Sequence, residues 1–133
     1  MLNPSTADAQ KLDPTVTRCL HYSRQWQFAS MVVCNLFAYR ATDPRRLLRA
    51  SEPVGKMNNR HIRQACHEAD LIILAWGNHG AHLGRADQVR KKLAVWSAPE
   101  KLAALRINNG GEPAHPLYLP KSLQPETYRL SDS

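Results

Sequence analysis

The sequence has no long apolar run and few cysteines, and both absences narrow the class of protein. The longest apolar run, residues 71–76, is far shorter than the roughly 20 residues that a membrane-spanning helix needs. The three cysteines are an odd number, widely spaced among apolar neighbours, which indicates buried thiols in a reducing compartment. No leader-like segment follows Met1, because Asn3-Pro4 comes directly after Leu2. We therefore predict a cytoplasmic protein without membrane association.

The motifs of common catalytic and cofactor sites are also missing. The chain has no C-x-x-C, no H-E-x-x-H, no P-loop, no G-x-G-x-x-G and no G-x-S-x-G. Ser5 has no evident general base nearby in sequence. These absences argue against a metal enzyme and a serine hydrolase, and we predict neither a metal nor a cofactor.

What is present is an ordinary globular composition with a basic excess. The 133 residues are 43% hydrophobic and 22% charged, which predicts one domain over residues 1–133, with an irregular tail from about residue 120. The net charge is +7, and most of the excess lies in the first half of the chain. Between residues 40 and 63 the basic side chains are Arg40, Arg45, Arg46, Arg49, Lys56, Arg60 and Arg63. Such a stretch favours DNA or a nucleotide as partner, and a merely solvated basic face is the alternative.

The hydrophobic pattern alternates between helices and short strands. Asp13-Pro14 is a helix start, and the spacing predicts a helix to about Gln25. Further helices are expected at 44–48, after Asn58 or Asn59, and around Val89, with strands at 30–36, 70–76 and 102–107. This order is typical of an α/β domain with a mainly parallel sheet.

The N-terminus is short for such a sheet. Met1-Leu2 is too brief to form a strand ahead of Asn3-Pro4, so either the first strand is absent or the true start lies upstream. We expect an upstream extension, if one exists in frame, to raise the melting temperature.

Polar side chains cluster where the predicted strands end, the edge at which parallel sheets form their pockets. Their amide, hydroxyl and imidazole groups suit a small polar ligand such as a nucleobase. The candidates are Asn3, Ser5, Thr6, Asp8, Asn35, Phe37, Trp76, His79, His115 and Tyr118.

Each candidate also has a structural explanation. Asn3 and Ser5 suit a turn, Asn35 a satisfied buried amide, and His115 a packed loop residue beside proline. Trp76 suits the core. A turn and a helix cap account for Asp8 and Asp13 equally well.

Five ordered strings resemble the domain of unknown function 1643 family. They are MLNPSTADA (1–9), DPTVTRC (13–19), NLFAYRATDP (35–44), AWGNHG (75–80) and HPLYL (115–119). The resemblance covers nearly the whole chain. The family supplies no established activity.

A more distant resemblance is to the uracil-DNA glycosylase superfamily. Leu2-Asn3-Pro4, Val33-Cys34-Asn35, Leu74-Ala75-Trp76-Gly77 and His115-Pro116-Leu117 are similar to its motifs and occur in the same order. The resemblance implies a three-layer α/β/α fold with a mainly parallel central sheet, whose first strand is here either absent or encoded upstream of Met1.

The same resemblance implies roles for individual residues. Asn3 would position the attacking water, although an amide is no general base, so hydrolysis would be slow. Asn35 would bind the edge of an extruded base, and His115 would donate to a base carbonyl. Arg40, Arg45, Arg46 and Arg49 would hold phosphates. Phe37 or Tyr118 would supply stacking.

Three functional hypotheses remain open. The first is a base-excising hydrolase that acts on DNA. The second is a non-catalytic module that binds a nucleotide or nucleic acid in the same pocket. The third is an enzyme of different chemistry that acts on a small nucleotide or metabolite. Basic charge favours the first two, and Asn at position 3 favours the second or a slow form of the first.

Overall fold

The computed structural model describes residues 1–2, 13–37, 44–117 and 119–130. Its helices are α1 (Pro14–Gln25), α2 (Pro44–Arg49), α3 (Asn58–Glu68) and α4 (Arg85–Trp96), with 3₁₀ segments η1 (Asn78–Gly84) and η2 (Pro99–Lys101). Its strands are β1 (Ile72–Leu74), β2 (Leu102–Ala104) and β3 (Glu126–Thr127). Within this part of the chain, every helix is too short or too polar to cross a membrane.

The sheet is small and mixed. β1 pairs with β2 in parallel, and β2 pairs with β3 antiparallel, in the order β1-β2-β3. The mixture of helices and strands is compatible with the predicted α/β class, whereas the described sheet has one parallel and one antiparallel pairing. β3 is a two-residue strand in the tail, where the Tyr128 N–H donates to the Leu102 carbonyl (3.0 Å) and holds the tail against β2.

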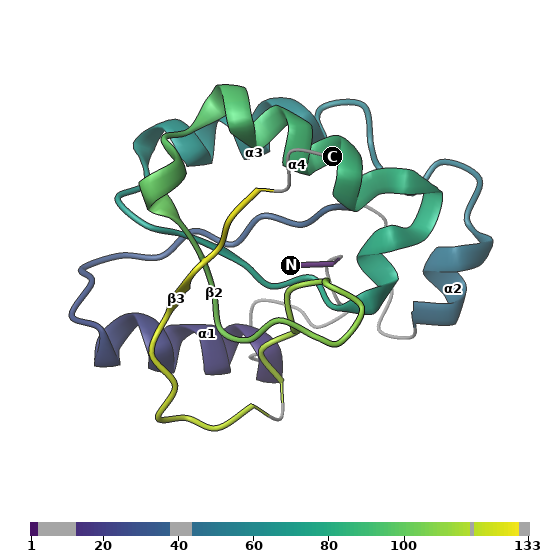
Figure 1. Ribbon diagram of the computed structural model, residues 1–133. Helices are drawn as coiled ribbons and strands as arrows, with labels where there is room; N and C mark the ends of the chain where they lie inside the picture. The colour runs from purple at the N-terminus through teal and green to yellow at the C-terminus, as the bar shows by residue number, and fades with distance from the viewer. Residues whose placement is uncertain (3–12, 38–43, 118, 131–133) are drawn as a thin grey trace.

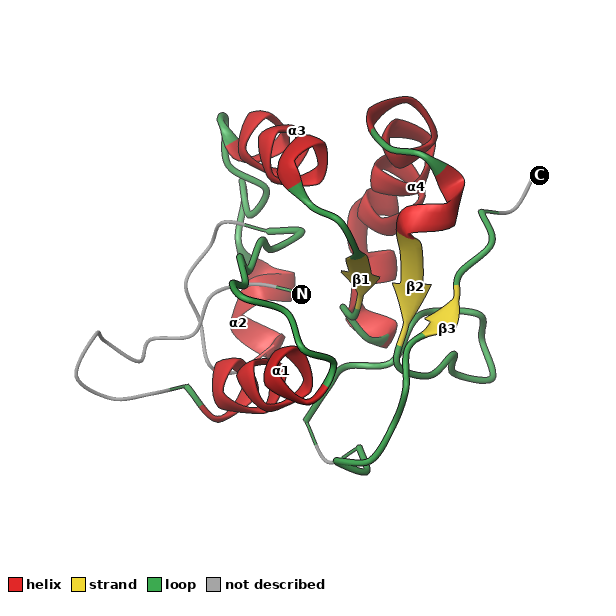
Figure 2. Ribbon diagram, turned by 90° about the vertical axis from the view of Figure 1, so that its left-hand side faces the viewer, coloured by secondary structure: helices red, strands yellow, loops and turns green. Residues whose placement is uncertain are grey.

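Helices cover both faces of the sheet. α3 and α4 lie on one face and α1 on the other, and the two views agree on this arrangement (Figures 1 and 2). The core between the sheet and α4 contains Leu74, Leu102, Val89 and Leu93. Val89 and Leu93 are four residues apart, so they fall on one face of α4, as predicted.

The segment 30–36, predicted to be a strand, is extended but forms none. Among the described residues its backbone pairs with Met1 and Leu2: the Leu36 and Phe37 N–H groups donate to the Met1 and Leu2 carbonyls, both at 2.9 Å. A strand is defined by its ladder, and in the described part of the chain no ladder runs along this segment.

Candidate functional site

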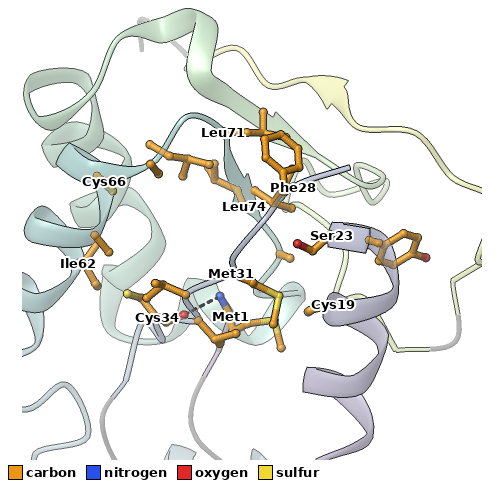
Figure 3. Close-up of a pocket in the computed structure, with 18 of the residues that line it drawn as sticks. Met1, Cys19, Ser23, Phe28, Met31, Cys34, Ile62, Cys66, Leu71 and Leu74 are labelled. Carbon is orange, nitrogen blue, oxygen red and sulfur yellow. Dashed lines mark hydrogen bonds between the residues drawn. The ribbon is translucent and has the colours of Figure 1, made fainter. Parts of the chain in front are cut away.

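A cavity of about 520 Å³ separates residues 28–36 from residues 68–76. α1 lines it from one face of the sheet, and α3 and α4 line it from the other. Figure 3 shows Met1 and Met31 in its middle, between Ile62 on α3 and Cys19 on α1. The lining is mostly apolar, so the few polar groups at its edge decide what it can bind.

Met1 is held at this cavity by the backbone on both sides of Asn35. Its ammonium donates to the Cys34 carbonyl (3.2 Å), and the Leu36 N–H donates to the Met1 carbonyl (2.9 Å). These two bonds make the pattern of a parallel pair. Burial lowers the pKa of the Met1 ammonium from 8.0 to about 6.

Asn35 presents a free amide to the cavity. Its backbone carbonyl accepts a hydrogen bond from Asn58 Nδ2 (2.8 Å), which fixes the main chain at the start of α3. The Asn35 side chain is half-buried and lines the cavity, and within the described part of the chain its amide makes no hydrogen bond. The amide therefore keeps an acceptor and two donors for a ligand.

His115 packs beside the end of β1. A Cβ at Gly77, whose φ is +78°, would lie 3.4 Å from His115 Cβ. The Leu117 N–H donates to His115 Nδ1 (3.3 Å), so in the neutral ring the proton is on Nε2. Burial lowers the pKa of His115, the Met1 ammonium lowers it further, and Asp13 opposes them. The ring is therefore a neutral donor at neutral pH.

Trp76 lines the cavity but its polar group is already occupied. The indole N–H donates to Glu112 Oε2 (2.5 Å), and the Arg90 guanidinium carbon lies 5.5 Å from the ring centroid. Only 4% of Trp76 is exposed, so it forms part of the wall of the cavity and of the core.

The other predicted site residues are spread more widely. Phe37 is fully buried outside the cavity lining, and His79 is exposed on η1. Arg45, Arg46 and Arg49 are exposed on α2. Six of the predicted residues lie outside the described residues: Asn3, Ser5, Thr6, Asp8, Arg40 and Tyr118. The structure thus places Asn35 and Trp76 in the lining of one cavity. His115 is outside this lining, and the Met1 ammonium contributes to its lowered pKa.

Comparison with family models gives one result, which covers most of the chain. The model described as "Protein of unknown function (DUF1643)" matches residues 1–117. The chain belongs to the DUF1643 family. No curated protein and no solved structure matches it. The family prediction is therefore confirmed, and the likeness of this DUF1643 protein to the uracil-DNA glycosylases stays a prediction from sequence.

Two residues near the site of this DUF1643 protein were missed or misassigned in the sequence. Asn58 or Asn59 was predicted to cap α3, but α3 has no side-chain cap, and the Asn58 side chain donates to the Asn35 and Leu36 carbonyls (2.8 and 2.9 Å). Arg85 is 1% exposed and donates from Nε to the Leu36 carbonyl (2.7 Å). Arg85 has a sequence signal: it stands four and eight residues before Val89 and Leu93, on their apolar face.

The described residues contain no group of three His, Cys, Asp or Glu side chains that would hold a metal ion. Burial raises the pKa of the thiols of Cys19, Cys34 and Cys66. Raised pKa values keep these thiols protonated, and a protonated thiol is neither a nucleophile nor a metal ligand. The polar side chains that line the cavity are therefore the Asn35 amide, hydroxyls such as those of Ser23 and Ser30, and the carboxylates of Glu68 and Asp70.

Proposed function

We propose that this protein binds a nucleobase, as part of a nucleotide or nucleic acid, at the end of the cavity next to Met1. The observation that carries the proposal is the Asn35 amide, which lines the cavity and makes no hydrogen bond to the described residues; the second polar group is the His115 Nε2–H, outside the lining, which also has no partner among those residues. Met1 forms hydrogen bonds with the two neighbours of Asn35, Cys34 and Leu36. The charge of the Met1 ammonium also lowers the pKa of His115. An amide and a neutral imidazole donor match the mixed donors and acceptors of a base edge.

The surface charge supports a polyanionic ligand. The net charge is +7, and arginines are exposed on both α2 and α3, including Arg46, Arg49, Arg60 and Arg63. Arginine matches phosphate oxygens with two parallel hydrogen bonds, and binding to nucleic acid through such contacts weakens steeply with salt.

Binding to single- and double-stranded oligonucleotides, measured by gel shift at several salt concentrations, tests the proposal. We expect the affinity to fall with increasing salt, and Asn35→Ala and His115→Ala to weaken binding at least tenfold. Asn109→Ala and His67→Ala are the matched controls, because both residues are exposed and lie outside the cavity lining. An affinity that does not change with salt concentration would favour a small metabolite as ligand. Equal affinity of all four variants would contradict the assignment of the site to Asn35 and His115.

A second candidate function is hydrolysis of the bond between base and sugar. The tautomer of His115 favours it, because a neutral Nε2–H can donate to a base carbonyl while that base leaves as an anion. In such a reaction water adds to the sugar carbon, the carbon–nitrogen bond breaks, and the water proton ends on the departing base. Asn3, predicted to position that water, lies outside the described residues.

Abasic-site formation on oligonucleotides that contain uracil or hypoxanthine separates the enzyme from the binding module. For an enzyme we expect His115→Ala to lower the rate constant about 10²–10³-fold, as the loss of an oxyanion donor does. Binding without any abasic product would leave the non-catalytic module as the function. Cleavage that is undiminished in His115→Ala would contradict the role given to this histidine.

A further inference from the structure

Three buried polar atoms have no hydrogen-bond partner within the part of the chain that the structure describes: Asn59 Oδ1, His82 Nε2 and Arg85 Nη2. Most buried polar atoms in proteins are paired, because an unpaired one loses its hydrogen bonds to water without replacement. The His82 and Arg85 side chains both lie against residues 36–37. Two unpaired donors beside one short segment indicate a ligand site.

Arg85 is the strongest of the three signals. It is 1% exposed, its Nε donates to the Leu36 carbonyl (2.7 Å), and its Nη1 donates to Gln88 Oε1 (2.6 Å). Nη2 is left free, and in the described residues no carboxylate forms an ion pair with this guanidinium. A buried charge without a counter-ion is costly, so an anion at Nη2 would compensate it.

Two helix N-termini converge at the same carbonyl. Asn58 opens α3 and donates from Nδ2 to the Leu36 carbonyl (2.9 Å), and Arg85, which donates to the same oxygen, opens α4. Neither helix has a side-chain cap on its first N–H groups. The first N–H of α3 donates to the Gly55 carbonyl and that of α4 to the Gly80 and His82 carbonyls, so it is the helix dipole that favours an anion at these ends.

His82 supplies a second side-chain donor at this place. Its ring centroid lies 5.7 Å from that of Phe37, the residue after Leu36, and its Nε2 is buried without a partner. The chain then turns through Leu83 and Gly84, which have φ of 56° and 66° and are exposed. The acidic residue in the first turn of α4, Asp87, is exposed and pairs with Arg90 (2.7 Å).

We propose that the N-termini of α3 and α4, with Arg85 and His82, form a binding site for a phosphate group. Arg85 Nη2 and His82 Nε2–H donate to its oxygens, and the dipoles of the two helices favour its negative charge. The phosphate belongs either to a nucleotide or to free inorganic phosphate. The site goes beyond the nucleobase site, because none of Asn59, His82 and Arg85 takes part in that proposal.

Calorimetry with sodium phosphate, at ionic strength matched with sodium chloride, tests the site directly. We expect saturable binding by the wild type and a melting temperature that rises with phosphate. Arg85→Met should raise the Kd at least tenfold. His82→Phe keeps a ring against Phe37 and removes the nitrogen, so it should raise the Kd several-fold.

Arg106→Met and His67→Phe are the matched controls, because both residues are exposed, and they should bind as the wild type does. If Arg85→Met fails to fold, His82→Phe against His67→Phe decides the matter. The proposal is overturned if the wild type binds no phosphate, or if the Arg85 and His82 variants that fold bind like their controls.

A nucleoside monophosphate and its nucleoside identify the source of the phosphate. Tighter binding of the monophosphate than of inorganic phosphate, lost in His82→Phe, would support a nucleotide. Equal affinity for the nucleoside monophosphate and for inorganic phosphate would support free phosphate as the ligand. If Asn35→Ala and His115→Ala bind phosphate as the wild type does, the phosphate site stands even where the nucleobase proposal fails.

Discussion

Gly80 lies against the indole of Trp76, so close that a Cβ at this position would overlap three ring atoms. The ring is held in place by the Glu112 hydrogen bond and by Arg90, and it cannot move aside without disturbing both. We predict that Gly80→Ala lowers the free energy of unfolding by about 1–3 kcal/mol, the usual cost of overpacking. Urea denaturation measures the change.

Gly110→Ala is the matched control for this prediction. Gly110 is exposed, and a Cβ there meets no atom within 4 Å. Its substitution should change the free energy of unfolding by less than about 0.5 kcal/mol. If both alanine variants unfold at the same urea concentration, the contact between Gly80 and Trp76 does not constrain the fold.

At the residue scale, the sequence located the candidates but not their partners. Trp76 was expected to suit the core, and its 4% exposure confirms this prediction. The acceptor of the Trp76 indole is Glu112, 36 residues later in the chain. No local pattern marks such a pair, because a side-chain hydrogen bond over this separation depends on how the intervening elements pack.

At the scale of the elements, the pairing of Met1-Leu2 with the segment that ends at Phe37 makes the free energy of unfolding depend on pH. The Met1 ammonium has a pKa of about 6 when folded and 8.0 when unfolded, so it is neutral in both states above pH 8. Below pH 6 the folded protein must hold a buried charge, at a cost of about 2.7 kcal/mol for two pKa units. We predict that the free energy of unfolding rises between pH 6 and pH 8.

Chemical denaturation across this pH range tests the prediction, and His115→Gln is the necessary control. The lowered pKa of His115 acts in the same direction, but below its ordinary value of 6.5. Cys19 and Cys34 stay protonated throughout, because burial raises the pKa of their thiols. Stability that stays flat from pH 6 to pH 8 in His115→Gln would show that the amine is not buried as a charged group.

Elements with local signals were predicted well, and those that depend on a distant partner were not. α1 begins after Asp13, whose carboxylate accepts from the Thr15 and Val16 N–H groups (2.6 and 3.2 Å), and it ends at Gln25 as expected. Strands predicted at 70–76 and 102–107 are shorter in the structure, at Ile72–Leu74 and Leu102–Ala104. A cap acts within its own turn of helix, whereas strand length is set by the neighbouring chain.

For the whole molecule, Arg90 joins three distant parts of the chain. It lies on α4, binds Glu112 (2.7 Å) after the Asn108–Gly111 turn, and donates from Nε to the Tyr128 hydroxyl (2.8 Å) beyond β3. Both side chains of the Arg90–Glu112 pair are only 16% exposed. We predict a coupling energy of about 1–3 kcal/mol between Arg90→Met and Glu112→Gln in a double-mutant cycle.

Glu112→Gln is chosen because glutamine retains an acceptor for the Trp76 indole. The internal comparison is Arg90 with Asp87, at the same 2.7 Å but with Asp87 78% exposed. For that exposed pair we expect a coupling energy of about 0.2–0.5 kcal/mol. Equal coupling energies in the two cycles would mean that burial does not strengthen the Glu112 pair.

The sequence by itself determined the helices, the α/β class, the family, and which polar residues are candidates for a site. These depend on caps, periodicity and ordered strings, all of which are local. Only the tertiary structure decided that the sheet is mixed, that Asn35 and Trp76 line one cavity, and that Arg85 is buried at two helix ends. The physical reason is that strand pairing and desolvation are properties of segments far apart in sequence, and only packing brings them together.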